Sequence, residues 1–312
     1  MWTATNYFIL TSITPASGLA TDAKFSKNNT IFGIITSTST IYVYNSSSPY
    51  ALLATITGGI GTGTSQIDFS YDGDYMLICG GNSNTAKVYS FITSAFITSV
   101  SFNAAYTCKF APNSNFAIAA TTSSTLNYYL LDGTQVWSQS YNGCLDLDFD
   151  STSATLVMSC NNGANKKAYG MDTATQTVTT IHTSSGMLRT AKITPDSSYA
   201  AYSGDEKILF IVNKTGAVYT LMYSFPLDSE AYSSDFSLDG NYLLVGTKAG
   251  YIYEYSKFCL DCSVGFYQNM TSLKCELCSE YNRACGACIN STYCIDCMQG
   301  YYLEQITTAF TT

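Results

Sequence analysis

The sequence predicts an all-β protein built from six repeats of four strands, the arrangement of a six-bladed β-propeller. Three observations support this fold class. A phrase of strand, turn and strand recurs six times along the 312 residues, its copies are about one blade apart, and no stretch shows sustained helical periodicity. Charged residues make up only 12% of the chain and there are 26 tyrosines, a composition typical of short strands and turns.

The phrase is clearest at Phe236-Ser-Leu-Asp-Gly-Asn-Tyr242, where an alternating strand stops at Asp239 and Gly240 and an apolar run follows. Asp-Gly favours the left-handed backbone conformation of a tight hairpin turn. The anchor residues of the six copies are Phe25, Phe69, Phe110, Phe149, Ile193 and Phe236. They are 44, 41, 39, 44 and 43 positions apart, which is the period of four-stranded blades.

The end of a predicted third strand follows each anchor by 19 to 22 residues. These ends are Tyr44-Asn45, Tyr89-Ser90, Leu131-Asp132, Met171-Asp172, Val212-Asn213 and Tyr255-Ser256. Trp-Asp occupies this position in WD-repeat proteins, and residues 5 to 258 resemble a degenerate WD-repeat β-propeller. The family's Gly-His pair is missing, and the single histidine, His182, could not serve six blades. The resemblance implies the propeller architecture without the family's polar network inside each blade.

Residues Asn6–Leu10 form a predicted strand that has no blade of its own. Each repeat supplies an inner, a second, a third and an outer strand, but the sixth repeat ends after Tyr251–Tyr255 and lacks its outer strand. We predict that the N-terminal strand takes this place and closes the ring, because it would satisfy the open hydrogen-bonding edge. A seventh blade upstream is the alternative if the chain is part of a longer one.

Nucleic-acid binding is disfavoured, because the net charge is −8 and the 14 basic residues are not clustered. No apolar run reaches the roughly 18 residues of a membrane-spanning helix, so none is predicted. Five glycosylation sequons lie at Asn28, Asn45, Asn213, Asn269 and Asn290. Single sequons arise often by chance in a chain rich in Ser and Thr, so the twelve cysteines decide the assignment. They indicate a secreted or cell-surface glycoprotein whose leader has been removed or lies upstream.

Four of the cysteines lie in the propeller. Cys144 and Cys160 are equally distant from the predicted turn near Thr152, so a regular hairpin would set them opposite each other. A disulfide and two buried thiols are both compatible with this position. Cys79 and Cys108 fall in adjacent blades and could also bridge, although their registers do not predict it.

From Cys259 onward, eight cysteines occur in 39 residues, which predicts a small module over residues 259–312 after a propeller over residues 1–258. The four C-x-x-C pairs are Cys259 with Cys262, Cys275 with Cys278, Cys285 with Cys288, and Cys294 with Cys297. Disulfide ladders use this spacing, and so do pairs of four-cysteine zinc sites.

Two details favour disulfides in this module. The phrases Cys262-Ser-Val-Gly-Phe-Tyr267 and Cys297-Met-Gln-Gly-Tyr-Tyr302 resemble the furin-like or growth-factor-receptor cysteine-rich repeats of extracellular proteins, including protist surface proteins. Two of the sequons fall in the same segment. We expect a crossed pairing of Cys259 with Cys275 and of Cys262 with Cys278. Because no further cysteine pair follows the second phrase, we expect the module to be cut in mid-repeat.

Asp146 and Asp148 alternate with Leu145 and Leu147 on a predicted inner strand, which places both carboxylates on one face. They could hold calcium, but the chain has no dedicated ligand loop, and a polar face lining the channel is the favoured interpretation. The glycine-rich segment Gly58–Gly63 lacks the Lys-Ser/Thr of a phosphate-binding loop and precedes a strand. We interpret it as a connection between blades.

The sequence therefore favours a non-enzymatic extracellular structural or interaction protein with no catalytic residues, metal or cofactor. Its expected partners are proteins, above all copies of itself in a filament or surface layer. The alternatives are a monomeric receptor head and a metal-dependent, lactonase-like propeller hydrolase. The hydrolase would need acidic side chains that converge at the channel mouth, for which Asp146, Asp148 and Glu230 are the candidates.

Overall fold

The computed structural model describes residues 17–57, 65–80, 85–101, 105–120, 125–141, 143–162 and 165–256, and four strands between 266 and 297. The chain divides into two compact units, Met1–Gly240 with Leu244–Tyr253, and Asn241–Leu243 with Glu254–Thr312. All regular elements of the described residues are strands, as the sequence predicts. No helix in this part of the chain is long and apolar enough to span a membrane.

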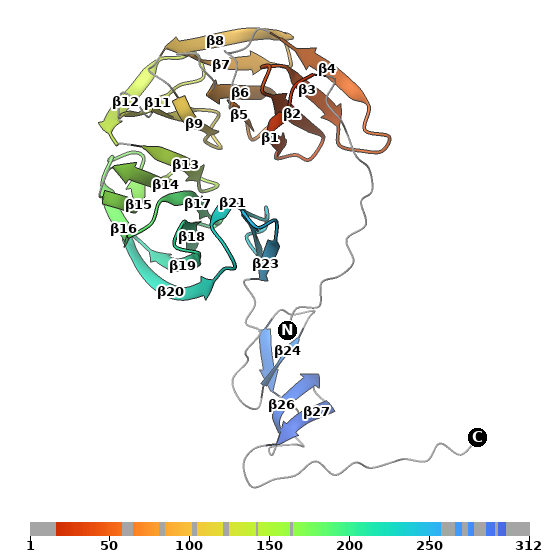
Figure 1. The fold of residues 1–312 in the computed structure, drawn as a ribbon, viewed down its shortest axis with the longest axis vertical. Coiled ribbons are helices and arrows are strands. Elements are labelled where there is room, and N and C mark those ends of the chain that lie inside the picture. The colour runs from red at the N-terminus through yellow and green to blue at the C-terminus, as the bar shows by residue number, and fades with distance from the viewer. Residues whose placement is uncertain are drawn as a thin grey trace, which may run out of the picture. The chain divides into compact units, whose positions relative to one another are not determined.

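The strands of the propeller form six sheets in chain order, which are the six blades (Figure 1). Blade 1 contains β1 (Ala20–Phe25), β2 (Ile31–Thr36), β3 (Ile41–Asn45) and β4 (Leu52–Ile56). Blade 2 contains β5 (Ser65–Phe69), β6 (Tyr75–Gly80), β7 (Thr85–Ser90) and β8 (Ala95–Ser101). Blade 3 contains β9 (Ala105–Phe110), β10 (Phe116–Ala120), β11 (Thr125–Tyr129) and β12 (Gln135–Ser140).

Blade 4 contains β13 (Cys144–Phe149), β14 (Thr155–Asn162), β15 (Asn165–Asp172) and β16 (Val178–Ser184). Blade 5 contains β17 (Leu188–Ile193), β18 (Tyr199–Gly204), β19 (Ile208–Thr215) and β20 (Val218–Pro226). Blade 6 contains β21 (Ala231–Phe236), β22 (Tyr242–Thr247) and β23 (Ile252–Ser256). The six-bladed propeller is therefore confirmed. The expected closing strand, Asn6–Leu10, and the segment Gly58–Gly63 lie outside the described residues.

The recurring phrase works as a hydrogen-bonded hairpin turn. In blade 2, the Ser70 hydroxyl donates to Asp72 and accepts the backbone N–H of Tyr75 at 2.9 Å. Gly73 has a φ of 81°, a conformation that glycine adopts without strain. The same pairing of a hydroxyl after the anchor with a carboxylate or amide two residues later is found in Ser26 with Asn28, Thr194 with Asp196 and Ser237 with Asp239.

Apolar side chains fill the spaces between neighbouring blades. Between blades 1 and 2, for example, Ile35 and Val43 pack with Ile67 and Met76, and all four are almost fully buried. Similar clusters join blades 2 and 3, 3 and 4, and 4 and 5. Each fully buried side chain of this size contributes about 1.5–3 kcal/mol, so these layers hold successive blades together.

Blade 1 differs from the other blades on its side away from blade 2. Its anchor Phe25 is 61% exposed, whereas the anchor Phe69 of blade 2 is 1% exposed. Phe25 and Phe32 lie 5.3 Å apart, and Phe32 stacks on Tyr44 at 5.2 Å. This aromatic cluster belongs to blade 1 alone, while the other clusters described above span two blades.

Two disulfides lie within the propeller. Cys144 and Cys160 are directly paired in register and form a disulfide, in agreement with the hairpin position read from the sequence. Cys79 of β6 and Cys108 of β9 form the second bridge, which joins blade 2 to blade 3 and which their registers do not predict. All four cysteines are buried, so both bridges are part of the packed core.

The C-terminal segment contains two antiparallel hairpins. β24 (Phe266–Asn269) pairs with β25 (Lys274–Leu277), and β26 (Cys285–Asn290) pairs with β27 (Tyr293–Cys297). The second hairpin sets Cys285 opposite Cys297 and Cys288 opposite Cys294 along the backbone. Cys259, Cys262 and Cys278 lie outside the described residues, so the crossed pairing stays a prediction.

We expect both propeller disulfides to stabilise the fold. Their cysteines are 29 and 16 residues apart, and in the chain-entropy model a cross-link over loops of this length contributes about 3 kcal/mol. The paired change Cys79→Ala with Cys108→Ala should lower the free energy of unfolding by about that amount, measured by denaturant titration. The pair Cys144→Ala with Cys160→Ala is the matched comparison, and an unchanged midpoint in either would contradict this role.

Candidate functional site in the central channel

The innermost strands of the six blades carry a charged residue directly before the anchor. These residues are Lys24, Asp68, Lys109, Asp148, Lys192 and Asp235. Their sign alternates from blade to blade around the channel, so each charge has neighbours of the opposite sign. Asp68, Lys109, Asp148 and Lys192 are buried, which makes pairing of these charges necessary. We call these six residues the charge ring.

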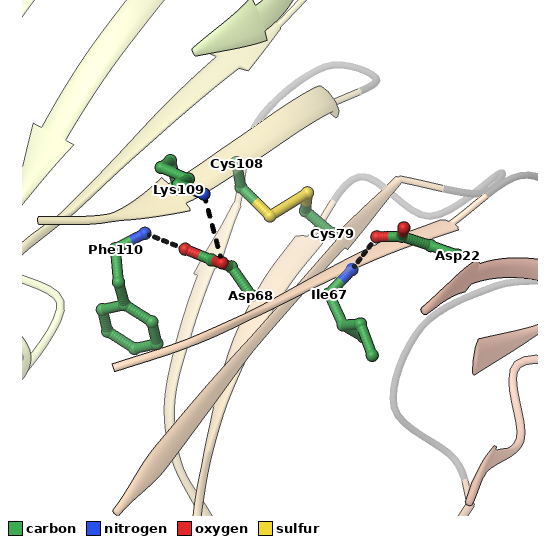
Figure 2. The surroundings of a disulfide bond; sticks show 7 residues. All are labelled: Asp22, Ile67, Asp68, Cys79, Cys108, Lys109 and Phe110. Atoms are coloured by element: carbon green, nitrogen blue, oxygen red, sulfur yellow. Dashed lines mark hydrogen bonds and ion pairs between the residues drawn. A yellow bond between two sulfur atoms is a disulfide. The ribbon is translucent and has the colours of Figure 1, made fainter. Parts of the chain in front are cut away.

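Carboxylates of the ring also bind the backbone of the following blade (Figure 2). Asp68 accepts the N–H of Phe110 at 2.8 Å through one oxygen, and its other oxygen lies 3.5 Å from the Lys109 ammonium. At the junction between blades 1 and 2, Asp22 accepts the backbone N–H of Ile67 at 3.1 Å. A carboxylate on one inner strand therefore satisfies a donor of the next inner strand, which ties blade 1 to blade 2 and blade 2 to blade 3.

The junction between blades 4 and 5 repeats this arrangement twice. Asp148 accepts the N–H of Ile193 and Asp146 accepts the N–H of Ala191, both at 3.1 Å. Asp146 also binds the Lys192 ammonium at 2.8 Å. The two carboxylates that suggested calcium are thus directed at backbone donors and lysines, and the polar channel face is the arrangement that the structure has.

Lys109 lies between two carboxylates, at 3.5 Å from both Asp68 and Asp148. Burial lowers the pKa of Lys109, but the attraction of these carboxylates outweighs it and holds the pKa well above its usual value. The pKa of Lys192 is raised in the same way, because Asp146 and Asp148 outweigh burial. A raised lysine pKa stabilises the fold at neutral pH, and this contribution is lost only at strongly alkaline pH.

A small pocket opens where the inner strands end. It is lined by ring residues Lys109, Asp148 and Asp235 and by the anchors Phe69 and Phe110, among others. Its cavity volume is ≈ 60 Å³. A polar cavity of this size has room for water.

The third carboxylate proposed for a metal site, Glu230, binds the Lys248 ammonium at 2.9 Å. It therefore has a different partner from Asp146 and Asp148. The described residues contain no group of three or more His, Cys, Asp or Glu side chains that could hold a metal ion.

His182 is packed among aromatic rings. Its ring centre lies 4.5 Å from that of Phe210 and 5.1 Å from that of Tyr202. Burial lowers the pKa of His182, and Glu206, 3.9 Å away, offsets this only in part. The imidazole is therefore neutral at neutral pH and forms part of the apolar packing of blades 4 and 5.

The five sequons lie in one turn and on four strands. Asn28 is in the turn after β1, where its amide donates to the backbone oxygen of Asp72 at 2.8 Å and so connects blades 1 and 2. Asn45 ends β3 and Asn213 lies in β19, while Asn269 ends β24 and Asn290 ends β26. Glycosylation of these residues stays a prediction.

No family model and no curated protein matches the chain. The similar solved structures include the β-propeller domain of Myceliophteria thermophila Cps50 (Swd1), which is 13% identical with a TM-score of 0.64 and covers 79% of this chain and 85% of that one. Hydrazine synthase of Kuenenia stuttgartiensis is 15% identical with a TM-score of 0.63 and covers 78% of each chain. These similarities show the fold alone, a propeller that resembles those of the WD-repeat type.

Removal of the Lys109 cation from the charge ring should strongly lower the free energy of unfolding. Lys109→Met keeps an apolar stem but leaves the buried carboxylates of Asp68 and Asp148 without their cation. Breaking a buried ion pair in this way should lower the free energy of unfolding by about 3–5 kcal/mol, measured by denaturant titration.

Lys248→Met is the matched control for this variant. Lys248 also pairs with a carboxylate, but its side chain is 59% exposed, and exposed ion pairs contribute little. Equal effects of Lys109→Met and Lys248→Met would contradict a structural role of the ring.

Proposed function

We propose that this protein is a non-enzymatic extracellular interaction protein, in which a rigid propeller presents its outer surfaces to protein partners and the cysteine-rich segment forms an arm. The observation that carries the proposal is the internal neutralisation of the channel. Lys109 of the charge ring pairs with Asp68 and Asp148, and Lys192 pairs with Asp146. Asp68 and Asp148 also accept backbone N–H groups of the next blade, and the pocket beside these residues is small. The channel thus has a structural role, and partners bind the outer surface of the propeller.

The disulfides support an extracellular location. Disulfides form and persist in oxidising compartments, and the propeller contains two in its core. The eight cysteines of residues 259–297 and the five sequons extend this argument along the whole chain. These features support the proposal of an extracellular glycoprotein with a disulfide-bonded arm.

The hydrolase alternative receives less support. It requires carboxylates free to bind a metal at one place, but Asp146 and Asp148 bind Lys192 and Lys109 as well as backbone donors. Glu230 binds Lys248. Each candidate ligand is already paired with a cation, so metal binding would have to displace these pairs.

We further propose that six blades close into a ring and that Asn6–Leu10 completes blade 6. The charge ring begins with Lys24 and ends with Asp235, so closure of six blades sets opposite charges side by side. Burial raises the pKa of Asp235, but the attraction of Lys192, Lys109 and Lys24 lowers it by more. Lys24 belongs to blade 1, so Asp235 of blade 6 lies within electrostatic reach of blade 1. The exposed anchor Phe25 would be covered in a closed ring.

Deletion of residues 1–12 should therefore open the ring. Without the closing strand, the edge of blade 6 and the aromatic cluster of blade 1 become accessible, so the melting temperature should fall and binding of a hydrophobic dye should rise. A deletion of residues 301–312 is the control. Unchanged melting after both deletions would show that closure does not depend on the N-terminal strand.

The extracellular role is tested on protein isolated from the cells that make it. Intact mass without reductant should be lower by about two units per disulfide than after reduction, and glycosidase treatment should remove further mass. Antibody applied to unpermeabilised cells, or to the medium, should detect the protein. Free thiols in the arm, bound zinc, or a protein found only inside the cell would contradict the proposal.

A further inference from the structure

The outer strand of each complete blade contains one extra residue at the same position. In β4, β8, β12, β16 and β20 the pairing with the third strand shifts by one residue, which is a β-bulge. The extra residues are Leu53, Ile97, Val136, Ile181 and Met222. All five are apolar, and all but Ile181 are 44–55% exposed. The outer strands of blades 1, 2, 3 and 5 thus each expose an apolar side chain at the bulge.

These outer strands also lack charge. None of the five contains Asp, Glu, Lys or Arg, whereas every inner strand contains at least one. Exposed sheet edges usually carry charged residues or proline, which prevent pairing with another chain. Here most charged residues of the propeller strands lie on the inner strands, and the five described outer strands have none.

Of these edges, β20 is best suited to association. It is nine residues long, the longest strand described, and it is the last strand of its sheet. Val218, Leu221, Met222 and Tyr223 are 46–63% exposed on it. A long, uncharged, apolar edge of this kind is a template for strand addition.

The sequence of β20 is nearly symmetric about its centre. Residues one to three positions from Met222 on either side are alike: Leu221 and Tyr223 are large and apolar, Thr220 and Ser224 carry hydroxyls, and Tyr219 and Phe225 are aromatic. Only the end residues of the strand, Val218 and Pro226, differ. Two copies of β20 paired antiparallel across a two-fold axis at Met222 would set these like residues opposite each other. Aromatic pairs and Thr–Ser pairs are favourable across antiparallel strands, and a two-fold interface requires such self-complementarity.

We propose that two copies of this chain associate through β20, with Met222 on the two-fold axis. This inference rests on the interaction role proposed above, and the partner that it identifies is a second copy of this chain. Met222 is the bulged residue, so the regular segments on either side of it supply the hydrogen bonds between the two strands. Its flexible side chain fills the space at the two-fold axis. A flat lipid surface fits less well, because the exposed apolar bulge residues lie on four different blades.

The test uses the full chain in solution. Sedimentation equilibrium over a range of concentrations should show a dimer of the 33.8 kDa chain. Met222→Lys places two like charges on the axis and should raise the dimer dissociation constant by at least roughly tenfold. Val136→Lys is the matched control, because Val136 is the bulged and equally exposed residue of β12, and it should leave the constant unchanged. Melting curves check that both variants are folded.

A second variant locates the axis. A residue on a two-fold axis meets its own copy, so Met222→Cys should form a disulfide-linked dimer under mild oxidation and Val136→Cys should not. A monomeric wild-type protein, equal effects of the two lysine variants, or no cross-link at position 222 would overturn the inference. A monomer that is secreted, glycosylated and disulfide-bonded would overturn this inference alone and leave the proposed function standing.

Discussion

The propeller depends on the hydrogen bond between a carboxylate of one inner strand and a backbone N–H of the next. Asp22, Asp68, Asp146 and Asp148 each make this bond. Neighbouring inner strands in a propeller belong to different sheets, so their backbones need such polar bridges in addition to apolar packing. The aspartates supply them, and the lysines between them neutralise the buried negative charge.

This use of charge explains the distribution of polarity over the molecule. Charged residues gather on the inner strands, where they join the blades, and are missing from the five described outer strands. The buried lysines of the inner strands are consequently paired with carboxylates, while the outer strands are uncharged and expose apolar residues. In this propeller the inner strands hold the blades together, and the rim is the surface that we propose for recognition.

The six blades could be predicted because the turn phrase has a local physical cause. Ser70, Asp72 and Gly73 form a turn with hydrogen bonds inside seven residues, and such local chemistry is visible in the sequence. The Cys144–Cys160 bridge could be predicted for the same reason, because it lies within one hairpin. The Cys79–Cys108 bridge joins two blades, and its geometry depends on packing that no local spacing reveals.

The charge ring could be predicted from the sequence only by comparing the six repeats with one another. The residue before each anchor alternates between lysine and aspartate, a signal that appears only when six repeats are compared at one position. Taken alone, Asp146 and Asp148 suggested a calcium site. Their partners, Lys192 and Lys109, are 46 and 39 residues away in the sequence and come together only through the fold.

A double-mutant cycle between Lys109 and Asp68 tests the central claim, that the ring charges act on one another to hold the blades together. The free energy of unfolding is measured for the wild type, Lys109→Met, Asp68→Asn and the double variant. The structure predicts a coupling energy of about 1–3 kcal/mol, because each single change leaves a buried partner unsatisfied. Single effects that add to within about 0.5 kcal/mol would show that the two residues act independently and would contradict the claim.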